Sequence, residues 1–422
     1  MSVTPIGRRR VVVTGMGAVT PLGNDVASTW QRLVAGESGV RTIESFDPSR
    51  LASRMAGEVR GFDPSRVLDR KDVRRNDRYT QLGLVATREA MDQAGLPERL
   101  EGAEAEQTGA IIGSGLGGST TLFEQIGVHV TRGPDRLSPF FIPMAIANLA
   151  SGQTAISFGA QGPNYATVSA CATGGHAIGE AAETILRGDA ETMLAGGSEA
   201  AVVEGIVGAF AAMRALSTRN DAPEAASRPF DAGRDGFVLA EGAATLVLEE
   251  LGHAERRGAR ILAEVCGYGA SADAHHITTP APGGAGAVRA ARRALQKAGI
   301  DPSEVDHVNA HATSTPEGDP SELAGFRTVF GDHAPKVSIT ATKSAIGHTL
   351  GAAGAIGAVA AIQALLTGCV PPTLNLTDPD PSVGELDCTP LTARQREMRV
   401  ALVNAFGFGG QNAVLVLRRW EG

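Results

Sequence analysis

The sequence predicts an α/β fold built from two comparable halves, and three observations support it. Short runs rich in β-branched residues recur between longer alanine-rich stretches, which is typical of strands that alternate with helices. The 422 residues are 43% hydrophobic and 20% charged, the balance of an ordinary globular chain. The 53 glycines, with only 4% aromatic residues, indicate closely packed helices and many tight turns.

The strand-like runs fall into two series that divide near residues 252–260. We therefore expect a first half of residues 1–255 and a second half of residues 256–422. The expected strands are residues 10–14, 108–113, 192–195, 243–249, 261–268, 305–309, 337–341, 398–404 and 413–417. The expected helices include residues 80–95, 172–187 and 286–298.

Charge and cysteine usage exclude several classes of partner. The formal net charge of −8 argues against nucleic acid, because phosphate binding needs a broad basic surface. The cysteines at 171, 266, 369 and 388 show neither a CxxC pair nor metal-ligand spacing. We therefore expect a cytoplasmic protein in a reducing compartment, with no metal site.

Two segments of the chain resemble targeting or membrane signals. Residues 7–10 (Gly-Arg-Arg-Arg) precede Val-Val-Val and resemble the start of a signal peptide, but the apolar run is too short. A β-strand fits it better. The longest apolar tract, residues 351–366, is shorter than the roughly 20 residues that span a bilayer. We expect a buried helix there and no membrane association.

Two glycine-rich segments resemble nucleotide-binding loops. Gly15-Met-Gly follows a strand, but Thr20 replaces the third glycine of the dinucleotide fingerprint and Pro21 opposes a helix start. Residues 113–118 lack the Gly-Lys-Ser/Thr ending of a phosphate-binding loop. We interpret both as tight turns and expect no nucleotide cofactor.

Cys171 lies where an apolar strand-like run meets a helix-like run of small residues, in Val-Ser-Ala-Cys-Ala-Thr-Gly-Gly-His. A turn of this kind projects a thiol from the end of a sheet, and the positive end of the helix favours its thiolate. The alternative is a buried apolar residue, as most free cysteines are.

Two histidines stand in equally distinctive segments. His311 follows an apolar strand and is either a packing residue or a polar group at the carboxyl end of a strand, where α/β sites form. His348 precedes a helix rich in glycine and alanine, with Lys343 five residues earlier. A cationic Lys343 would disfavour an imidazolium and keep a neutral N–H donor. The other seven histidines, including His275 and His276, are expected to be surface or packing residues.

These three segments resemble the active-site motifs of the β-ketoacyl-acyl carrier protein synthases, in the synthase II branch of the thiolase superfamily. Residues 10–23, 227–242 and 404–412 are similar to the family's opening strand, mid-chain signature and C-terminal glycine-rich loop. The matches together run from about residue 10 to residue 417. The resemblance implies a thiolase-like fold, with two similar βαβ-rich halves stacked as α-β-α-β-α layers. The first half would carry the nucleophile and the second both histidines.

The resemblance also implies a decarboxylative condensation. Cys171 would accept an acyl chain from an acyl carrier protein, because a thiol can hold and then release an acyl group as a thioester. His311 and His348 would stabilise the enolate formed from the malonyl-loaded carrier, and Lys343 would support them. The backbone N–H groups of Cys171 and Phe408 would form the oxyanion hole, with Phe408 as a gate on flanking glycines.

The resemblance further implies where substrates bind. Thr313 and Thr315 would hydrogen-bond the phosphopantetheine arm, which arrives on the carrier, so that the chain itself needs no cofactor. Leu116 and Phe210 would line the acyl pocket. Phe141 would be contributed across the interface of a homodimer.

Carrier docking is expected at a basic cluster. Lys71, Arg74 and Arg75 stand close together on a negatively charged protein. Such a cluster is often only a solvated helix face, but these positions match the family's docking patch for acidic carriers. Arg214 and Thr278 match further docking positions.

Enzymes and proteins with related functions would differ from this chain at the same residues. A degradative thiolase would carry a second cysteine in residues 404–412, and a synthase III enzyme would have Asn in place of His348. A non-catalytic chain-length partner would lack Cys171. We therefore expect a synthase II enzyme that elongates fatty acids by two-carbon units. The remaining alternative is the catalytic ketosynthase subunit of a type II polyketide synthase.

Overall fold

The computed structural model describes residues 9–422, so residues 7 and 8 of the basic segment discussed above lie outside the described residues. All nine expected strands are present, and they form a mixed sheet in the order β4-β5-β6-β1-β7-β13-β12-β8-β9. Their bounds are β1 Val11–Val19, β4 Thr108–Gly113, β5 Thr192–Glu199, β6 Gly242–Glu250, β7 Ala263–Ala272, β8 His307–Asn309, β9 Ser338–Thr340, β12 Val400–Gly407 and β13 Gln411–Arg419.

The sheet consists of two groups of strands that meet along a narrow seam. β1 pairs with β6 over its whole length but with β7 only at Val12 and Val13. The group β4-β5-β6-β1 therefore turns one face toward the group β7-β13-β12-β8-β9. Two helices, α8 (Thr173–Arg187) and α14 (Ala353–Thr367), contact strands of both groups and lie between them.

Helices also cover the two outer faces. α3 (Arg78–Gln93) packs against β1, β5 and β6, and α11 (Ala285–Ala298) packs against β7 and β13. α12 (Gly318–Phe330) packs beside α11. The result is the predicted α-β-α-β-α stack, and the expectation of a thiolase-like α/β fold is confirmed. The predicted boundary between residues 255 and 256 stays a prediction.

Small residues allow the two central helices to touch. A Cβ atom added to Gly354 of α14 would lie 2.5 Å from the backbone nitrogen of Gly175 in α8. The segment Leu350–Thr367 is long and apolar enough to cross a membrane by length and composition alone, but 83% of it is buried inside the protein. A buried helix was expected at this position.

One turn prediction is wrong. Gly15 and Gly17 do not form a tight turn but lie within β1, with α3 directly above them. A Cβ atom on Gly15 would lie 2.0 Å from the carbonyl oxygen of Ala90, and one on Gly17 would lie 1.9 Å from that of Ala86. The glycines are required by close packing of a helix on a strand. The second glycine-rich segment does form an irregular turn after β4.

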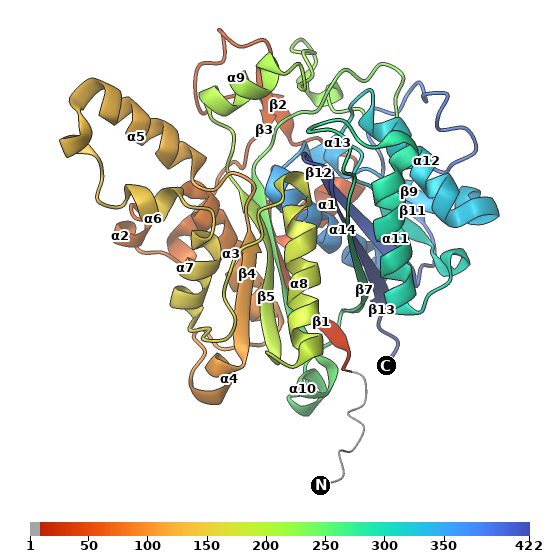
Figure 1. Cartoon of the computed structure of the whole chain (residues 1–422), viewed down its shortest axis with the longest axis horizontal. Helices are drawn as coiled ribbons and strands as arrows, with labels where there is room; N and C mark the ends of the chain where they lie inside the picture. Colours follow the sequence, from red (N-terminus) through yellow and green to blue (C-terminus); the bar gives the residue numbers. More distant parts are fainter. Residues whose placement is uncertain (1–8) are drawn as a thin grey trace.

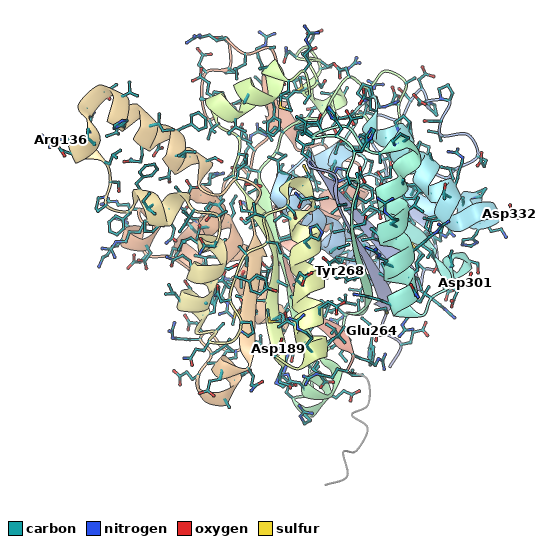
Figure 2. The ribbon with its side chains drawn as sticks, viewed as in Figure 1. Arg136, Asp189, Glu264, Tyr268, Asp301 and Asp332 are labelled. Atoms are coloured by element: carbon teal, nitrogen blue, oxygen red, sulfur yellow. The ribbon has the colours of Figure 1, made fainter. Side chains whose placement is uncertain are left out.

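An arm made of α5 (Ser119–Arg132) and α6 (Phe141–Ala145) projects from the body at the left of Figure 1. Figure 2 shows Arg136 at the outer end of this arm. The remaining elements are α1 Val26–Val34, α2 Arg70–Val73, α4 Gly102–Glu106, α7 Leu149–Phe158, α9 Glu204–Ala212, α10 Leu251–Arg256, α13 Lys343–Ile346, β2 Val40–Thr42, β3 Met55–Gly57, β10 Cys369–Val370 and β11 Arg394–Gln395.

Candidate active site

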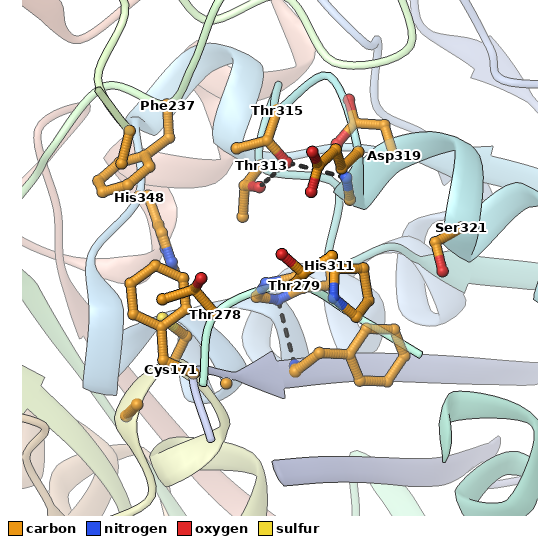
Figure 3. Close-up of a pocket in the computed structure, with 18 of the residues that line it drawn as sticks. Cys171, Phe237, Thr278, Thr279, His311, Thr313, Thr315, Asp319, Ser321 and His348 are labelled. Atoms are coloured by element: carbon orange, nitrogen blue, oxygen red, sulfur yellow. Dashed lines mark hydrogen bonds between the residues drawn. The ribbon is translucent and has the colours of Figure 1, made fainter. Parts of the chain in front are cut away.

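Most of the predicted site residues converge on one pocket of about 500 Å³ (Figure 3). Lys343 is buried close to it, and Phe141, Lys71, Arg74 and Arg75 lie outside its lining. The predicted residues that line the pocket are Cys171, His311, His348, Phe408, Thr313, Thr315, Leu116, Phe210, Arg214 and Thr278.

Cys171 lies at a strained turn at the start of α8. It belongs to a short 3₁₀ helix, Ala170–Ala172, in which Ala170 has a φ of +49°. A non-glycine residue in this region costs energy, so neighbouring contacts must hold the turn. Two of them involve Ser169: its N–H donates to Thr173 Oγ1 at 2.8 Å, and its hydroxyl is 2.7 Å from His176 Nδ1. The turn presents the thiol to the pocket.

The surroundings of Cys171 shift the pKa of its thiol upward. Burial raises the pKa of Cys171 to about 12, although Lys343 and the backbone N–H groups of Phe408 and Cys171 oppose this shift. Desolvation is the largest of these effects. The expectation that the helix terminus favours the thiolate stays a prediction.

Backbone contacts fix the tautomer of His311. The N–H of Phe406 points at His311 Nδ1, at 3.3 Å. Because Nδ1 accepts, the proton of the neutral ring belongs on Nε2. The backbone N–H of His311 donates to Glu322 Oε1 at 2.8 Å, which anchors the residue just after β8. His311 thus offers one N–H donor for the pocket.

His348 is held by β-like pairing and by aromatic packing. Its N–H donates to the carbonyl of Val238 at 2.7 Å, and its carbonyl accepts from Ala240 N–H at 2.9 Å. Its ring meets Phe237 edge-on at 5.4 Å and His311 at 5.6 Å between centroids. In the described part of the chain its Nδ1 atom is buried without a hydrogen-bond partner.

Electrostatics keep both imidazoles neutral. Burial lowers the pKa values of His311 and His348 well below the usual 6.5, and the positive charge of Lys343 lowers them further. The pKa of Lys343 itself falls to about 8 by burial, opposed by the negative charge of Glu322. The positive charge of Lys343 lowers the pKa of His348, which is the effect that the sequence predicted for a cationic Lys343.

Sequence reasoning missed three buried acids, Glu199, Asp319 and Glu322. Glu322 accepts hydrogen bonds from the N–H groups of His311 and Ala312 and from the amide of Asn404, at 2.7–2.8 Å. Ala312 has a φ of +24°, so this carboxylate holds a backbone conformation that favours glycine. The available signal was a pair of acids three residues apart on the helix that follows His311.

Phe408 lies in the turn between β12 and β13, where glycines are required. Gly409 and Gly410 have φ values of +84° and +72°. A Cβ atom on Gly407 would lie 2.6 Å from the carbonyl oxygen of Ser169, two residues before Cys171. The turn therefore packs directly on the nucleophile, whereas its movement as a gate stays a prediction. Within residues 9–422, no cluster of three or more His, Cys, Asp or Glu side chains is arranged to hold a metal.

A thiol and two neutral imidazoles, at the junction of two stacked halves, define a condensing enzyme of the thiolase type. The chain belongs to the β-ketoacyl synthase family. Residues 8–254 match the family's N-terminal domain, and residues 262–377 match its C-terminal domain.

Similar proteins cover the chain almost completely. It is 48% identical to the 3-oxoacyl-[acyl-carrier-protein] synthase 2 of Coxiella burnetii, over 98% of this chain and 99% of that one. It is 46% identical to the protein of the same name from Synechocystis, with the same coverage.

Solved structures agree with this family. A β-ketoacyl synthase from Burkholderia phymatum has 36% identity and a TM-score of 0.91, covering 98% of this chain and 100% of its own. A type II polyketide ketosynthase in complex with its acyl carrier protein has 33% identity and a TM-score of 0.89, with the same coverage. The predicted family is confirmed.

Proposed function

We propose that the chain is a β-ketoacyl-[acyl-carrier-protein] synthase of type II, an acyltransferase that elongates fatty acids by decarboxylative condensation. The observation that carries this function is the convergence of Cys171 with the neutral rings of His311 and His348 in one pocket. This combination supplies a nucleophile and two hydrogen-bond donors without a bound cofactor.

The first half-reaction transfers the acyl group. The sulfur of Cys171 attacks the thioester carbonyl of an acyl-loaded carrier, and the thiol proton passes to the departing phosphopantetheine sulfur. The new carbon–sulfur bond replaces the old one. The backbone N–H groups of Cys171 and Phe408, which lower the pKa of the Cys171 thiol, would stabilise the oxyanion.

The second half-reaction makes the carbon–carbon bond. The malonyl-loaded carrier loses carbon dioxide, and the electron pair of the broken bond forms an enolate. Neutral N–H groups on His311 and His348 stabilise its oxygen. The enolate carbon then attacks the acyl-cysteine, the cysteine sulfur leaves, and a 3-oxoacyl carrier is released. Lys343 helps by keeping both rings neutral.

The fatty acid pathway is favoured over polyketide synthesis. Relatives named 3-oxoacyl-[acyl-carrier-protein] synthase 2 have 45–48% identity, whereas the type II polyketide ketosynthase described above has 33%. An acyl carrier protein is then the partner that delivers both substrates and the phosphopantetheine arm. The protein would act in the cytoplasm.

The proposed substrate contacts follow the pocket lining. Thr313 and Thr315, whose hydroxyls are 3.2 Å apart, face the pocket and would bind the phosphopantetheine arm. Leu116 and Phe210 would bound the acyl chain. Arg214 and Thr278 line the same pocket, and with Lys71, Arg74 and Arg75 they would receive the carrier.

The test is formation of the condensation product. Incubation with acyl-loaded and malonyl-loaded carrier should yield a 3-oxoacyl carrier and one carbon dioxide per product, measured by mass spectrometry and gas release. Cys171→Ala should abolish the product, whereas Cys266→Ala, which changes another free cysteine outside the pocket, should leave it. Product formation by Cys171→Ala would overturn the proposal.

A further inference from the structure

Glu199 is a fully buried carboxylate at the end of β5, and uncharged donors surround it. Its Oε1 atom accepts from the hydroxyl of Ser114 at 2.8 Å and from the N–H of Leu116 at 3.1 Å. Its Oε2 atom accepts from the N–H groups of Gly115 at 2.8 Å and Gly351 at 2.9 Å. Hydrogen bonds to a charged group are stronger than neutral ones. Four of them to one buried carboxylate therefore fix the positions of the groups that donate them.

The donors come from two segments that serve different parts of the site. Ser114–Leu116 follow β4 and end at the pocket-lining Leu116. Gly351 belongs to the turn that starts at Leu350, two residues after His348, where Leu350 has a φ of +45°. We call Ser114–Leu116 the neck of the proposed acyl pocket, because Leu116 would bound the acyl chain. Glu199 holds both this neck and the turn that follows His348.

The two segments also touch each other, with no room to adjust independently. A Cβ atom on Gly351 would lie 2.4 Å from the nitrogen of Gly115 and 2.7 Å from Glu199 Oε2. The residues after β4 are also bonded to one another, since Gly117 N–H donates to the Ser114 hydroxyl at 2.9 Å. A shift of the neck therefore transmits to the turn beside His348.

We propose that Glu199 is a positioning residue that fixes the acyl-pocket neck and the turn after His348 relative to each other. Acyl-chain selection and enolate stabilisation then depend on the same carboxylate. The inference rests on the proposed function and adds to it a residue that links its two half-reactions.

Glu199→Gln tests the link with little change of shape. An amide replaces one acceptor by a donor, so at least one backbone N–H loses its partner, whichever way the amide points. We expect the ratio between the fastest and slowest acyl chain lengths in Cys171 acylation to fall about fivefold or more. Carbon dioxide release by the acylated enzyme should fall by a similar factor.

Two further variants separate positioning from general stability. Ser114→Ala removes the hydroxyl that donates to Glu199 and accepts from Gly117 N–H, and it leaves the Gly351 contact in place. It should therefore weaken chain-length selection while carbon dioxide release stays within about twofold. Glu89→Gln is the control. Glu89 is another carboxylate with a pKa raised by burial, to about 7, but it holds the N–H groups of Ala18 and Val26, away from the pocket. Both readouts should match the wild type.

The outcomes distinguish this inference from the proposed function. A wild-type chain that forms no acyl-cysteine and releases no carbon dioxide overturns the proposed function, and this inference with it. An active wild type with Glu199→Gln indistinguishable from Glu89→Gln overturns the inference alone. So does an equal loss for every chain length in Glu199→Gln. If Glu199→Gln does not fold, an unchanged chain-length ratio in Ser114→Ala decides against it.

Discussion

The neutral state of His311 and His348 is the residue-level property on which the chemistry depends. A protonated imidazole would bind the malonyl carboxylate as a salt and oppose its loss. Burial and the charge of Lys343 lower both pKa values, so the neutral rings persist at pH values where an ordinary histidine is charged.

This gives a pH prediction. A histidine is neutral at every pH above its pKa, and both histidine pKa values lie well below the usual value. Carbon dioxide release should therefore show no histidine-like step near pH ~6.5. The rate should change instead as pH rises through about 8, where Lys343 loses its proton. A pH–rate profile of the acylated enzyme measures this. A loss of half the rate near pH 6.5 would contradict the assignment of neutral rings.

Chain-length control is predicted at Leu116. Leu116→Phe adds bulk at a fixed neck, and overpacking of this kind costs roughly 1–3 kcal/mol. Long acyl chains should therefore lose about tenfold or more in acylation rate, while short chains are spared. Leu186→Phe, at the other end of α8 from Cys171, is the matched control. An equal fall in the acylation rate for all chain lengths, with a lower melting temperature, would show that Leu116 does not line the acyl pocket.

At the residue scale, local motifs were enough to find Cys171, His311, His348 and Lys343. The raised pKa of Cys171 could not be predicted, because burial is a property of the assembled halves. Glu322 was missed for the same reason: its partners, His311 and Asn404, are distant in sequence.

At the scale of elements, the basic cluster on and after α2 is the proposed docking patch. Lys71 and Arg74 are exposed, whereas Arg75 stacks over Phe140 at 4.9 Å and so also supports the arm. Reversal of Lys71 and Arg74 alone therefore tests docking with least disturbance of the fold.

Lys71→Glu with Arg74→Glu should raise the apparent Michaelis constant for carrier-bound substrates about tenfold, because charge complementarity with an acidic carrier is lost. A small thioester substrate should be nearly unaffected, and added salt should weaken the wild-type interaction. The matched control is Arg256→Glu with Arg260→Glu, at the last residue of α10 and four residues after it. Equal losses with both kinds of substrate would indicate misfolding rather than docking.

Strand and helix positions were predictable because the β-branched runs are short and distinct. The residues at which strands and helices end were harder to predict. β1 continues to Val19 through Gly15 and Gly17, since α3 packs on the glycines and protects the strand. Turn propensity alone could not reveal a helix that lies elsewhere in the sequence.

At the scale of the whole molecule, the arm carries an exposed apolar surface that a single chain leaves uncovered. The exposed fractions are 40% at Phe123, 47% at Ile126, 76% at Val130 and 63% at Ile142. Surfaces of this kind mark interaction sites. Phe141, predicted to act across a dimer interface, lies on the same arm in α6.

We therefore predict a homodimer. Light scattering should report twice the mass of the chain, and Ile126→Glu with Val130→Glu should shift the protein toward monomer with loss of activity. A charge placed in an apolar interface core is strongly unfavourable. A stable, fully active wild-type monomer at micromolar concentration would exclude the proposed contribution of Phe141.

The five-layer arrangement was predictable only through the resemblance. Periodicity indicated alternating strands and helices, but it does not say that α8 and α14 share one central layer. That placement depends on contacts between the halves, such as Gly175 with Gly354. The active site lies at the same junction, which is why its electrostatics emerged only from the assembled fold.

The most direct test of the central claim is intact-mass spectrometry of the protein after incubation with an acyl-loaded carrier. We predict a single acyl adduct on the wild-type chain, retained in Cys266→Ala and absent in Cys171→Ala. Addition of the malonyl-loaded carrier should then discharge the adduct. An adduct that persists unchanged in Cys171→Ala would contradict the account.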